Sequence, residues 1–223
     1  MTAMPSAGRS RAWGWRTGVD VAIAGSLSAM PPGFDRSAYP APEQEIDNYR
    51  EVIEILRLAG VDIIALEMLE DTEHAPRAMQ AATEADLPVW LGVSCRRDPS
   101  SGKLVSFSGE VIALEKILTA LLPYKPAVVN LMHSEITTIS DAMRMVAAVH
   151  DGPIGVYPES GYFTHPNWNF VDIIPPEDLV EEARRWVKEG AQILGGCCGT
   201  GPEHIRALRD VLPTLRADSD SLD

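Results

Sequence analysis

The chain has 223 residues, of which 45% are hydrophobic and 23% are charged, and its formal net charge at pH 7 is -13. This length suits one domain with a sizeable core, and the composition is that of a folded protein. The negative charge excludes nucleic acid and anionic membrane surfaces as natural partners, because both would be repelled. No apolar run reaches the roughly 18 residues of a membrane span, and the arginine-containing start lacks the apolar core of a secretory signal. We therefore expect a cytoplasmic protein.

Short apolar runs alternate along the chain with longer amphipathic ones, which predicts six strand–helix units. The expected strands cover residues 19–25, 61–67, 88–94, 126–132, 153–158 and 191–196. The expected helices cover residues 43–60, 73–86, 110–123, 135–149, 176–190 and 201–212, with a polar hairpin-like loop at 96–109. The strands are apolar throughout, which is typical of parallel strands covered on both faces. The pattern predicts an α/β fold, either a barrel or a doubly wound sheet. The glycine-rich and lysine-containing motifs of nucleotide-binding folds are absent.

Polar or reactive side chains lie at or just after the carboxyl end of each expected strand. They are Ser26, Glu67, Ser94 with Cys95, Asn130, Tyr157, and the pair Cys197 and Cys198. In both α/β architectures this edge of the sheet is where functional sites are built. We therefore expect these side chains to surround one site.

The adjacent pair Cys197 and Cys198 is the most specific of these features. With Cys95 it makes only three cysteines, and adjacent cysteines could form a disulfide only with severe strain, so we expect reduced thiols. The glycine-rich stretch "GGCCGTG" allows both sulfurs to converge, and thiolates are zinc ligands. The start of a helix at Pro202 favours the thiolate form. The alternative is two small buried apolar side chains.

The stretch "GGCCGTGPEHIRAL", preceded by "WVKEGAQIL", resembles the C-terminal signature of the homocysteine S-methyltransferases. The stretches "VAIAGSLS", "AGVDIIALEMLEDTEHA" and "VYPESGYF" support the resemblance, which covers about residues 20–212. It implies a (β/α)8 TIM-type barrel, incomplete in this chain, with about six β-α units and the first two missing. We expect a remnant helix or disorder at 1–18, the homocysteine-binding barrel at 19–213 and a polar tail at 214–223.

The resemblance also implies a reaction. Three cysteines bind zinc, the sulfur of homocysteine takes the open position, and a methyl group moves from an S-methyl or N-methyl onium donor to that sulfur, giving methionine. Cys197 and Cys198 are the implied zinc ligands in this chain. Glu67 is implied to hold the amino group of homocysteine, with Ser26 and Asn130 also binding substrate. Nothing in the sequence separates S-methylmethionine, betaine and methylcobalamin as donors.

The chain departs from the family pattern at two places in the site. Leu131 follows Asn130 where the family has its first zinc cysteine, and leucine cannot bind a metal. His133 or Cys95 could be the third ligand, although we favour a loop histidine without a ligand role for His133. Glu159 stands where the family has asparagine. These departures leave open a non-catalytic or repurposed barrel that binds another small thiol or amino acid. Because an open barrel exposes two sheet edges, a second copy or a partner could cover it.

Overall fold

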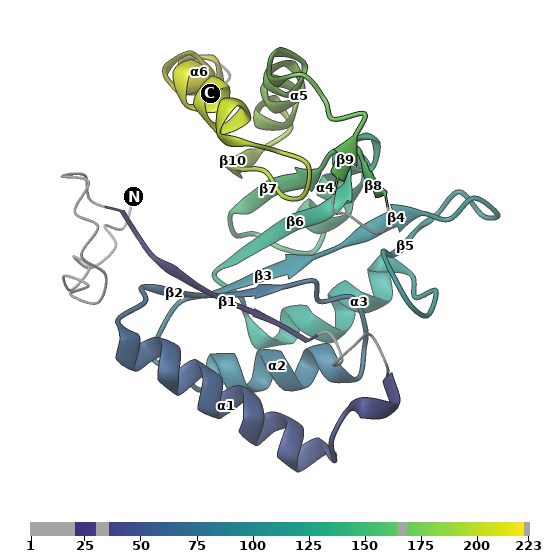
Figure 1. Cartoon of the computed structure of the whole chain (residues 1–223), viewed down its shortest axis with the longest axis vertical. Coiled ribbons are helices and arrows are strands. Elements are labelled where there is room, and N and C mark those ends of the chain that lie inside the picture. Colours follow the sequence, from purple (N-terminus) through teal and green to yellow (C-terminus); the bar gives the residue numbers. More distant parts are fainter. Residues whose placement is uncertain (1–20, 30–35, 165–168, 221–223) are drawn as a thin grey trace.

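A six-stranded parallel sheet forms the centre of the molecule (Figure 1). The structure, a computed structural model, describes residues 21–29, 36–164 and 169–220, with side chains of the last helix described through residue 215. The strands of the sheet are β1 (Ala24–Ser28), β2 (Ile63–Glu67), β3 (Val89–Val93), β6 (Val128–Glu135), β7 (Ile154–Glu159) and β10 (Ala191–Leu194). Their order in the sheet is their order in the chain, and all neighbouring strands are parallel.

This strand order separates the two architectures that the sequence left open. A doubly wound sheet reverses its strand order at a switch point, whereas a barrel adds each strand on the same side of the last. The order observed here is of the barrel type, which confirms the expected α/β barrel fold. In the part of the chain that the structure describes, β1 and β10 do not pair with each other, so the sheet is open. An incomplete barrel was therefore the correct expectation.

In the ranges that the structure describes, six α-helices connect and cover the strands. They are α1 (Pro42–Ala59), α2 (His74–Thr83), α3 (Leu114–Leu121), α4 (Ile139–Ala147), α5 (Pro176–Lys188) and α6 (Pro202–Asp220), with short 3-10 turns at Arg36–Ala38, Leu122–Tyr124 and Ile136–Thr138. Figure 1 shows α1, α2 and α3 together along one side of the curved sheet, with α5 and α6 side by side next to β10. Their inward faces and the strands share one hydrophobic core.

Helix α1 shows how the sequence determines these elements. Its residues Ile46, Tyr49, Ile53 and Leu56 recur at helical spacing, and all four lie in or against the core. The helix ends at Gly60, whose φ of 89° places it in the left-handed region, and its N–H donates to the carbonyl of Arg57 at 3.0 Å.

Several expected boundaries were wrong. The strand expected to end at 132 continues to Glu135, so the helix expected to begin at 135 begins only at Ile139. The first strand was expected at 19–25, but β1 spans Ala24–Ser28 because its pairing starts where β2 starts, with Ala24 opposite Ile63. The last helix was expected to end at 212, with a polar tail from 214, but α6 continues to Asp220 with Pro213 inside it. The expectation for residues 1–18 lies outside the described residues.

Two hairpins extend from the carboxyl edge of the sheet. The first joins β4 (Cys95–Arg97) to β5 (Leu104–Ser106) and confirms the hairpin expected after the third strand. The second joins β8 (Tyr162–Thr164) to β9 (Asn169–Val171), where the sequence had predicted only a long loop. Each hairpin follows the end of a sheet strand, so both flank the edge where the polar side chains gather.

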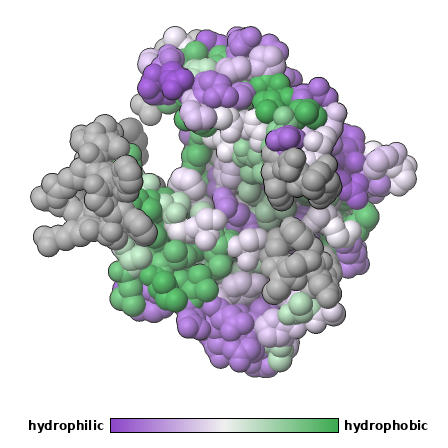
Figure 2. Space-filling view, in the orientation of Figure 1, coloured by the Kyte–Doolittle hydropathy of each residue, from purple (hydrophilic) through white to green (hydrophobic). Residues whose placement is uncertain are grey.

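The face shown in Figure 2 mixes polar and apolar side chains, and an apolar area lies over α1. Val52, Ile55 and Leu58 of this helix are exposed, Leu58 by 71%. No helix in the described ranges is both long enough and apolar enough to cross a bilayer.

Candidate functional site

Ser26, which lies in the middle of β1, meets Glu67 at the carboxyl end of β2. Residue Ser28 of β1 lies opposite Glu67 in the sheet register, and the Oγ of Ser26 donates to Oε2 of Glu67 at 2.5 Å. The structure therefore brings together two of the three residues predicted to bind substrate. The carboxylate is partly exposed at this edge and can accept a hydrogen bond from a cationic ligand.

The turn that carries Cys197 and Cys198 is bonded to the end of β7. Three main-chain hydrogen bonds join the two segments: Gly195 N to Val156 O at 2.9 Å, Cys197 N to Pro158 O at 3.1 Å, and Ser160 N to Cys198 O at 2.9 Å. The turn is closed by Thr200, whose N–H and Oγ donate to the carbonyl of Cys197. The cysteines thus continue the sheet pairing of β10 with β7 and do not belong to a free loop.

Gly199, which follows the two cysteines, is required by this geometry. Its φ is 78°, and a Cβ at this position would lie 1.8 Å from the carbonyl oxygen of Ser160. Only glycine combines the left-handed backbone with the close approach to β7. The glycine-rich sequence around the cysteines is therefore explained in part by the turn itself.

His133 joins the two cysteines in a compact cluster. The ligand atoms of His133, Cys197 and Cys198 all lie within 4.8 Å of one another, and all three residues are half-buried. The Nδ1 of His133 lies 3.6 Å from the Sγ of Cys197. Tetrahedral zinc, with bonds of about 2.3 Å to sulfur and about 2.0 to 2.1 Å to nitrogen, places such ligand atoms about 3.6 Å apart. The spacing and the donor types fit zinc.

A bulge in β6 directs His133 into this cluster. Met132 pairs with Tyr157 and Glu135 with Glu159, so β6 has one more residue than β7 between these pairs. The φ of His133 is 42°, which is unusual for a residue other than glycine. The expectation that His133 is a loop histidine was wrong, because it lies inside β6. On its other side, the Nε2 of His133 is 3.4 Å from a carboxylate oxygen of Glu159.

The other two candidate positions lie outside the cluster. Leu131 is fully buried in the hydrophobic core. Cys95 is also fully buried, and its thiol bonds to Ser134 and Thr138. Of the two residues that the sequence left open as a third ligand, the structure places His133 beside the cysteine pair and Cys95 in the core.

Asn130, the third predicted substrate-binding residue, is fully buried within β6. Its amide nitrogen and oxygen have no hydrogen-bond partner among the residues that the structure describes. Its Oδ1 occupies space left by Gly155 on β7, where a Cβ would lie 1.9 Å from this oxygen. Two polar atoms without partners are costly in a core, so they are available to a water molecule or a ligand.

Burial and negative charge dominate the electrostatics of the site. Burial raises the pKa of Cys197 to about 12, and the charges of Cys198 and Glu67 act in the same direction. The pKa of Tyr157 is also raised, first by burial and then by Glu67. Burial lowers the pKa of His133, which favours the neutral imidazole that metals bind. These groups surround a position where a cation is favoured.

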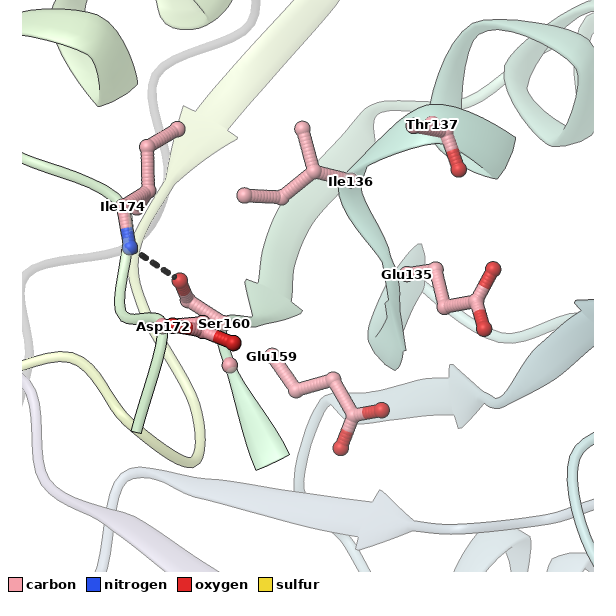
Figure 3. A pocket seen from close by; sticks show the side chains of 8 residues that line it. Glu135, Ile136, Thr137, Glu159, Ser160, Asp172 and Ile174 are labelled. Atoms are coloured by element: carbon pink, nitrogen blue, oxygen red, sulfur yellow. Dashed lines mark hydrogen bonds between the residues drawn. The ribbon is translucent and has the colours of Figure 1, made fainter. Parts of the chain in front are cut away.

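A cavity of about 360 Å³ adjoins the cluster through Glu159 (Figure 3). Its lining includes the carboxylates of Glu135, Glu159 and Asp172. Burial and then the neighbouring charge of Glu135 raise the pKa of Glu159. The Oγ of Ser160 accepts a hydrogen bond from the N–H of Ile174 at 2.7 Å, and this bond joins two of the segments that line the cavity. Sequence reasoning had noted Glu159 only as a departure from the family and had missed its contact with His133.

The fold and this cluster define an α/β-barrel protein with a candidate metal site of two thiols and an imidazole. The family model for homocysteine S-methyltransferase matches residues 4–212, and the chain belongs to this family. The match begins before the region in which the sequence motifs were recognised.

Curated relatives agree with the family assignment. A selenocysteine Se-methyltransferase of Brassica oleracea var. italica is 30% identical over 176 residues, covering 77% of this chain and 49% of that protein. Homocysteine S-methyltransferase 3 of Arabidopsis thaliana is 29% identical over 180 residues, covering 74% of this chain and 48% of that protein. The chain therefore spans about half the length of these relatives.

Solved structures agree with the fold. The apo form of the homocysteine methyltransferase MmuM from Escherichia coli matches with a TM-score of 0.63 and 22% identity, covering 85% of this chain and 62% of that one. A metallated form of the same protein matches with the same TM-score. At this level of identity the likeness shows the shared fold.

Proposed function

We propose that this chain transfers a methyl group from an S-methyl or N-methyl onium donor to the sulfur of homocysteine, giving methionine. The observation that carries this proposal is the cluster of two thiols and an imidazole at the carboxyl edge of a barrel-type sheet, in a chain of this family. Catalytic sites of such barrels lie at that edge.

Cys197 and Cys198 would hold zinc in this site, because their sulfurs converge, are half-buried and are soft donors. Zinc bound there would keep the acceptor sulfur as a thiolate at neutral pH, where a free thiol with a pKa of about 8.5 is mostly protonated.

The chain's own residues would orient the acceptor. The carboxylate of Glu67 would accept hydrogen bonds from the amino group of homocysteine, and Ser26 would fix that carboxylate through its own hydrogen bond. The amide of Asn130, which has no partner among the described residues, would bond to the substrate or to a water beneath it.

The negative charge of the adjoining cavity supports a cationic donor. Glu135, Glu159 and Asp172 line it, and carboxylates attract a sulfonium or quaternary ammonium group. This feature does not select one onium donor over another.

One observation favours a second candidate function. Leu131 replaces the first family cysteine and is buried away from the cluster, which would suit a repurposed barrel that binds a small thiol or amino acid without methylating it. Binding of homocysteine without turnover, in protein loaded with zinc, would support this alternative.

The localisation, the domain bounds and the partners of the chain are part of the same proposal. The three cysteines are free thiols, which supports a reducing cytoplasm. The homocysteine-binding barrel domain is proposed to span residues 19–213. The unpaired edges of β1 and β10 in the described sheet suit cover by a second copy or a partner.

The test is transfer of a labelled methyl group by the purified full chain loaded with zinc. Homocysteine and selenocysteine are supplied as acceptors, and S-methylmethionine and betaine as donors. We expect labelled methionine from homocysteine, and loss of turnover in Cys198→Ser. Cys95→Ser is the control, because Cys95 lies in the core and should not affect the reaction. Zinc-loaded, folded protein that transfers no methyl group from either donor would overturn the proposal.

A further inference from the structure

We propose that His133 is the third protein ligand of the metal, through Nδ1, and that Glu159 positions its imidazole through Nε2. This inference rests on the proposed function, since it concerns the same metal site. It gives one explanation for two departures from the family pattern. The nitrogen of His133 replaces the sulfur that is missing at Leu131, and Glu159 supports this nitrogen ligand.

The first argument is the direction of the two ring nitrogens. One nitrogen of His133 faces Cys197 Sγ at 3.6 Å, while the opposite nitrogen faces Glu159 Oε2 at 3.4 Å. A histidine that binds a metal through one nitrogen usually donates the other N–H to a carboxylate or carbonyl, which fixes the ring and its tautomer. The carboxylate of Glu159 lies where such a partner is needed, at ion-pair distance from Nε2 of His133.

The second argument is the backbone. In a regular strand His133 would lie on the same face as Leu131, whose side chain is buried in the core. The extra residue in β6 and the φ of 42° at His133 interrupt this alternation. Bulges and left-handed residues of this kind re-aim side chains near functional sites. Here the bulge brings the imidazole to the cysteines.

The third argument is the packing around the ring. The ring of Phe107 contacts that of His133 edge-on, with centroids 4.7 Å apart and an angle of 63° between the ring planes, and this contact restricts rotation of the imidazole. Glu159 is half-buried between His133 and the cavity, in the position where the family has asparagine. Asparagine could accept the same hydrogen bond but would not carry the charge that strengthens it.

The first measurement is zinc affinity, by competition with a chromophoric chelator. We expect Glu159→Gln to weaken zinc binding about 10- to 100-fold, as loss of a carboxylate behind a histidine ligand does. His133→Ala should weaken it further. Glu203→Gln is the matched control, because Glu203 lies 3.4 Å from the Nδ1 of His204 but outside the cluster. Its zinc affinity should equal that of the wild type.

The second measurement is the zinc X-ray absorption spectrum, which counts ligands without any turnover. We expect two sulfur ligands and at least one nitrogen ligand in the wild type, and three sulfurs in His133→Cys. The His133→Cys variant keeps the inference testable if His133→Ala does not fold. A third sulfur in its zinc spectrum requires folded, metal-bound protein.

Two results would overturn the inference: unchanged zinc affinity in folded His133→Ala, or a wild-type spectrum with sulfur ligands and no imidazole scattering. Failure of the proposed function looks different. In that case zinc binds with two sulfurs and one imidazole, but added homocysteine contributes no third sulfur and no methyl transfer occurs.

Discussion

The Oγ of Ser26 donates a 2.5 Å hydrogen bond to Oε2 of Glu67 and joins the middle of β1 to the end of β2. The bond uses one oxygen of the carboxylate, and no residue that the structure describes donates a hydrogen bond to the other. It connects the first strand of the sheet to a residue whose charge acts on Cys197 in the last turn of the site. The charge of Glu67, on one side of the open barrel, therefore acts on the cysteine turn on the other side.

Replacing Glu67 by glutamine should weaken binding of homocysteine to the zinc-loaded protein. The substitution removes the negative charge that is proposed to face the amino group, and a hydrogen bond to a charged group contributes roughly 1.5 to 3 kcal/mol, or about 10- to 150-fold in affinity. Isothermal titration measures this change. Ser26→Ala should give a smaller loss, because it frees the carboxylate without removing it. Equal affinity in Glu67→Gln and the wild type would exclude Glu67 from substrate binding.

Gly155→Ala should destabilise the fold by about 1 to 3 kcal/mol, the usual cost of overpacking a core. The new methyl group would lie 1.9 Å from the Oδ1 of Asn130. The second substitution Asn130→Ala should restore much of the loss, because it removes the clashing amide. Urea unfolding of the single and double variants measures the coupling. Additive effects of the two substitutions would show that the clash is relieved elsewhere.

Asp71→Ala should lower the free energy of unfolding by about 1 to 2 kcal/mol. The Oδ1 of Asp71 accepts hydrogen bonds from the backbone N–H groups of Glu73, His74 and Ala75 at 2.7, 2.6 and 3.2 Å. These N–H groups lie at the start of α2 and have no partner within the helix. Asp71→Asn keeps an oxygen at this position and should lose less. Chemical denaturation of the three proteins distinguishes these outcomes.

The stability of the protein should fall as the pH rises through the titration of Glu70. Burial raises the pKa of Glu70 above its ordinary value of 4.5, and the charge of Asp71 adds to this, while hydrogen bonds from Ser108 oppose it. The folded state therefore holds the proton more tightly than the unfolded state. This contribution is complete below pH 4.5 and is lost as the pH rises to the folded-state pKa.

Glu70→Gln should lose this pH dependence, because glutamine does not titrate. The measurement is the difference in unfolding free energy between the wild type and Glu70→Gln across the acidic range. The wild type should become less stable relative to the variant as the pH increases. The opposite slope would mean that the hydrogen bonds from Ser108 outweigh burial.

Much of the fold could be predicted from the sequence because the signals are local. The periodicity of α1 and its end at Gly60 depend on residues within one segment, as do the apolar strands. The start of β1 was misplaced because Ala24 pairs with Ile63, a contact that no local pattern reveals. The extension of α6 beyond Pro213 was missed for a related reason, since proline normally indicates a helix end.

The site was predicted unevenly. Ser26, Glu67 and the cysteine pair were predicted to share one edge of the sheet because parallel strands bring their carboxyl ends together, and the structure pairs Ser26 with Glu67. The approach of His133 to Cys197 could not be read in this way, because it depends on one additional residue in β6 relative to β7. A histidine two positions after a missing cysteine, together with an acidic residue in place of asparagine, was the available signal.

The main-chain bonding of the cysteine turn to β7 has a consequence for metal uptake. The backbone at Cys197 and Cys198 is ordered by the sheet before any ion arrives, so little chain entropy remains to be lost on loading. Such a pocket is preorganised: the metal-depleted protein should keep its shape, and exchange of the ion should proceed without unfolding of the turn.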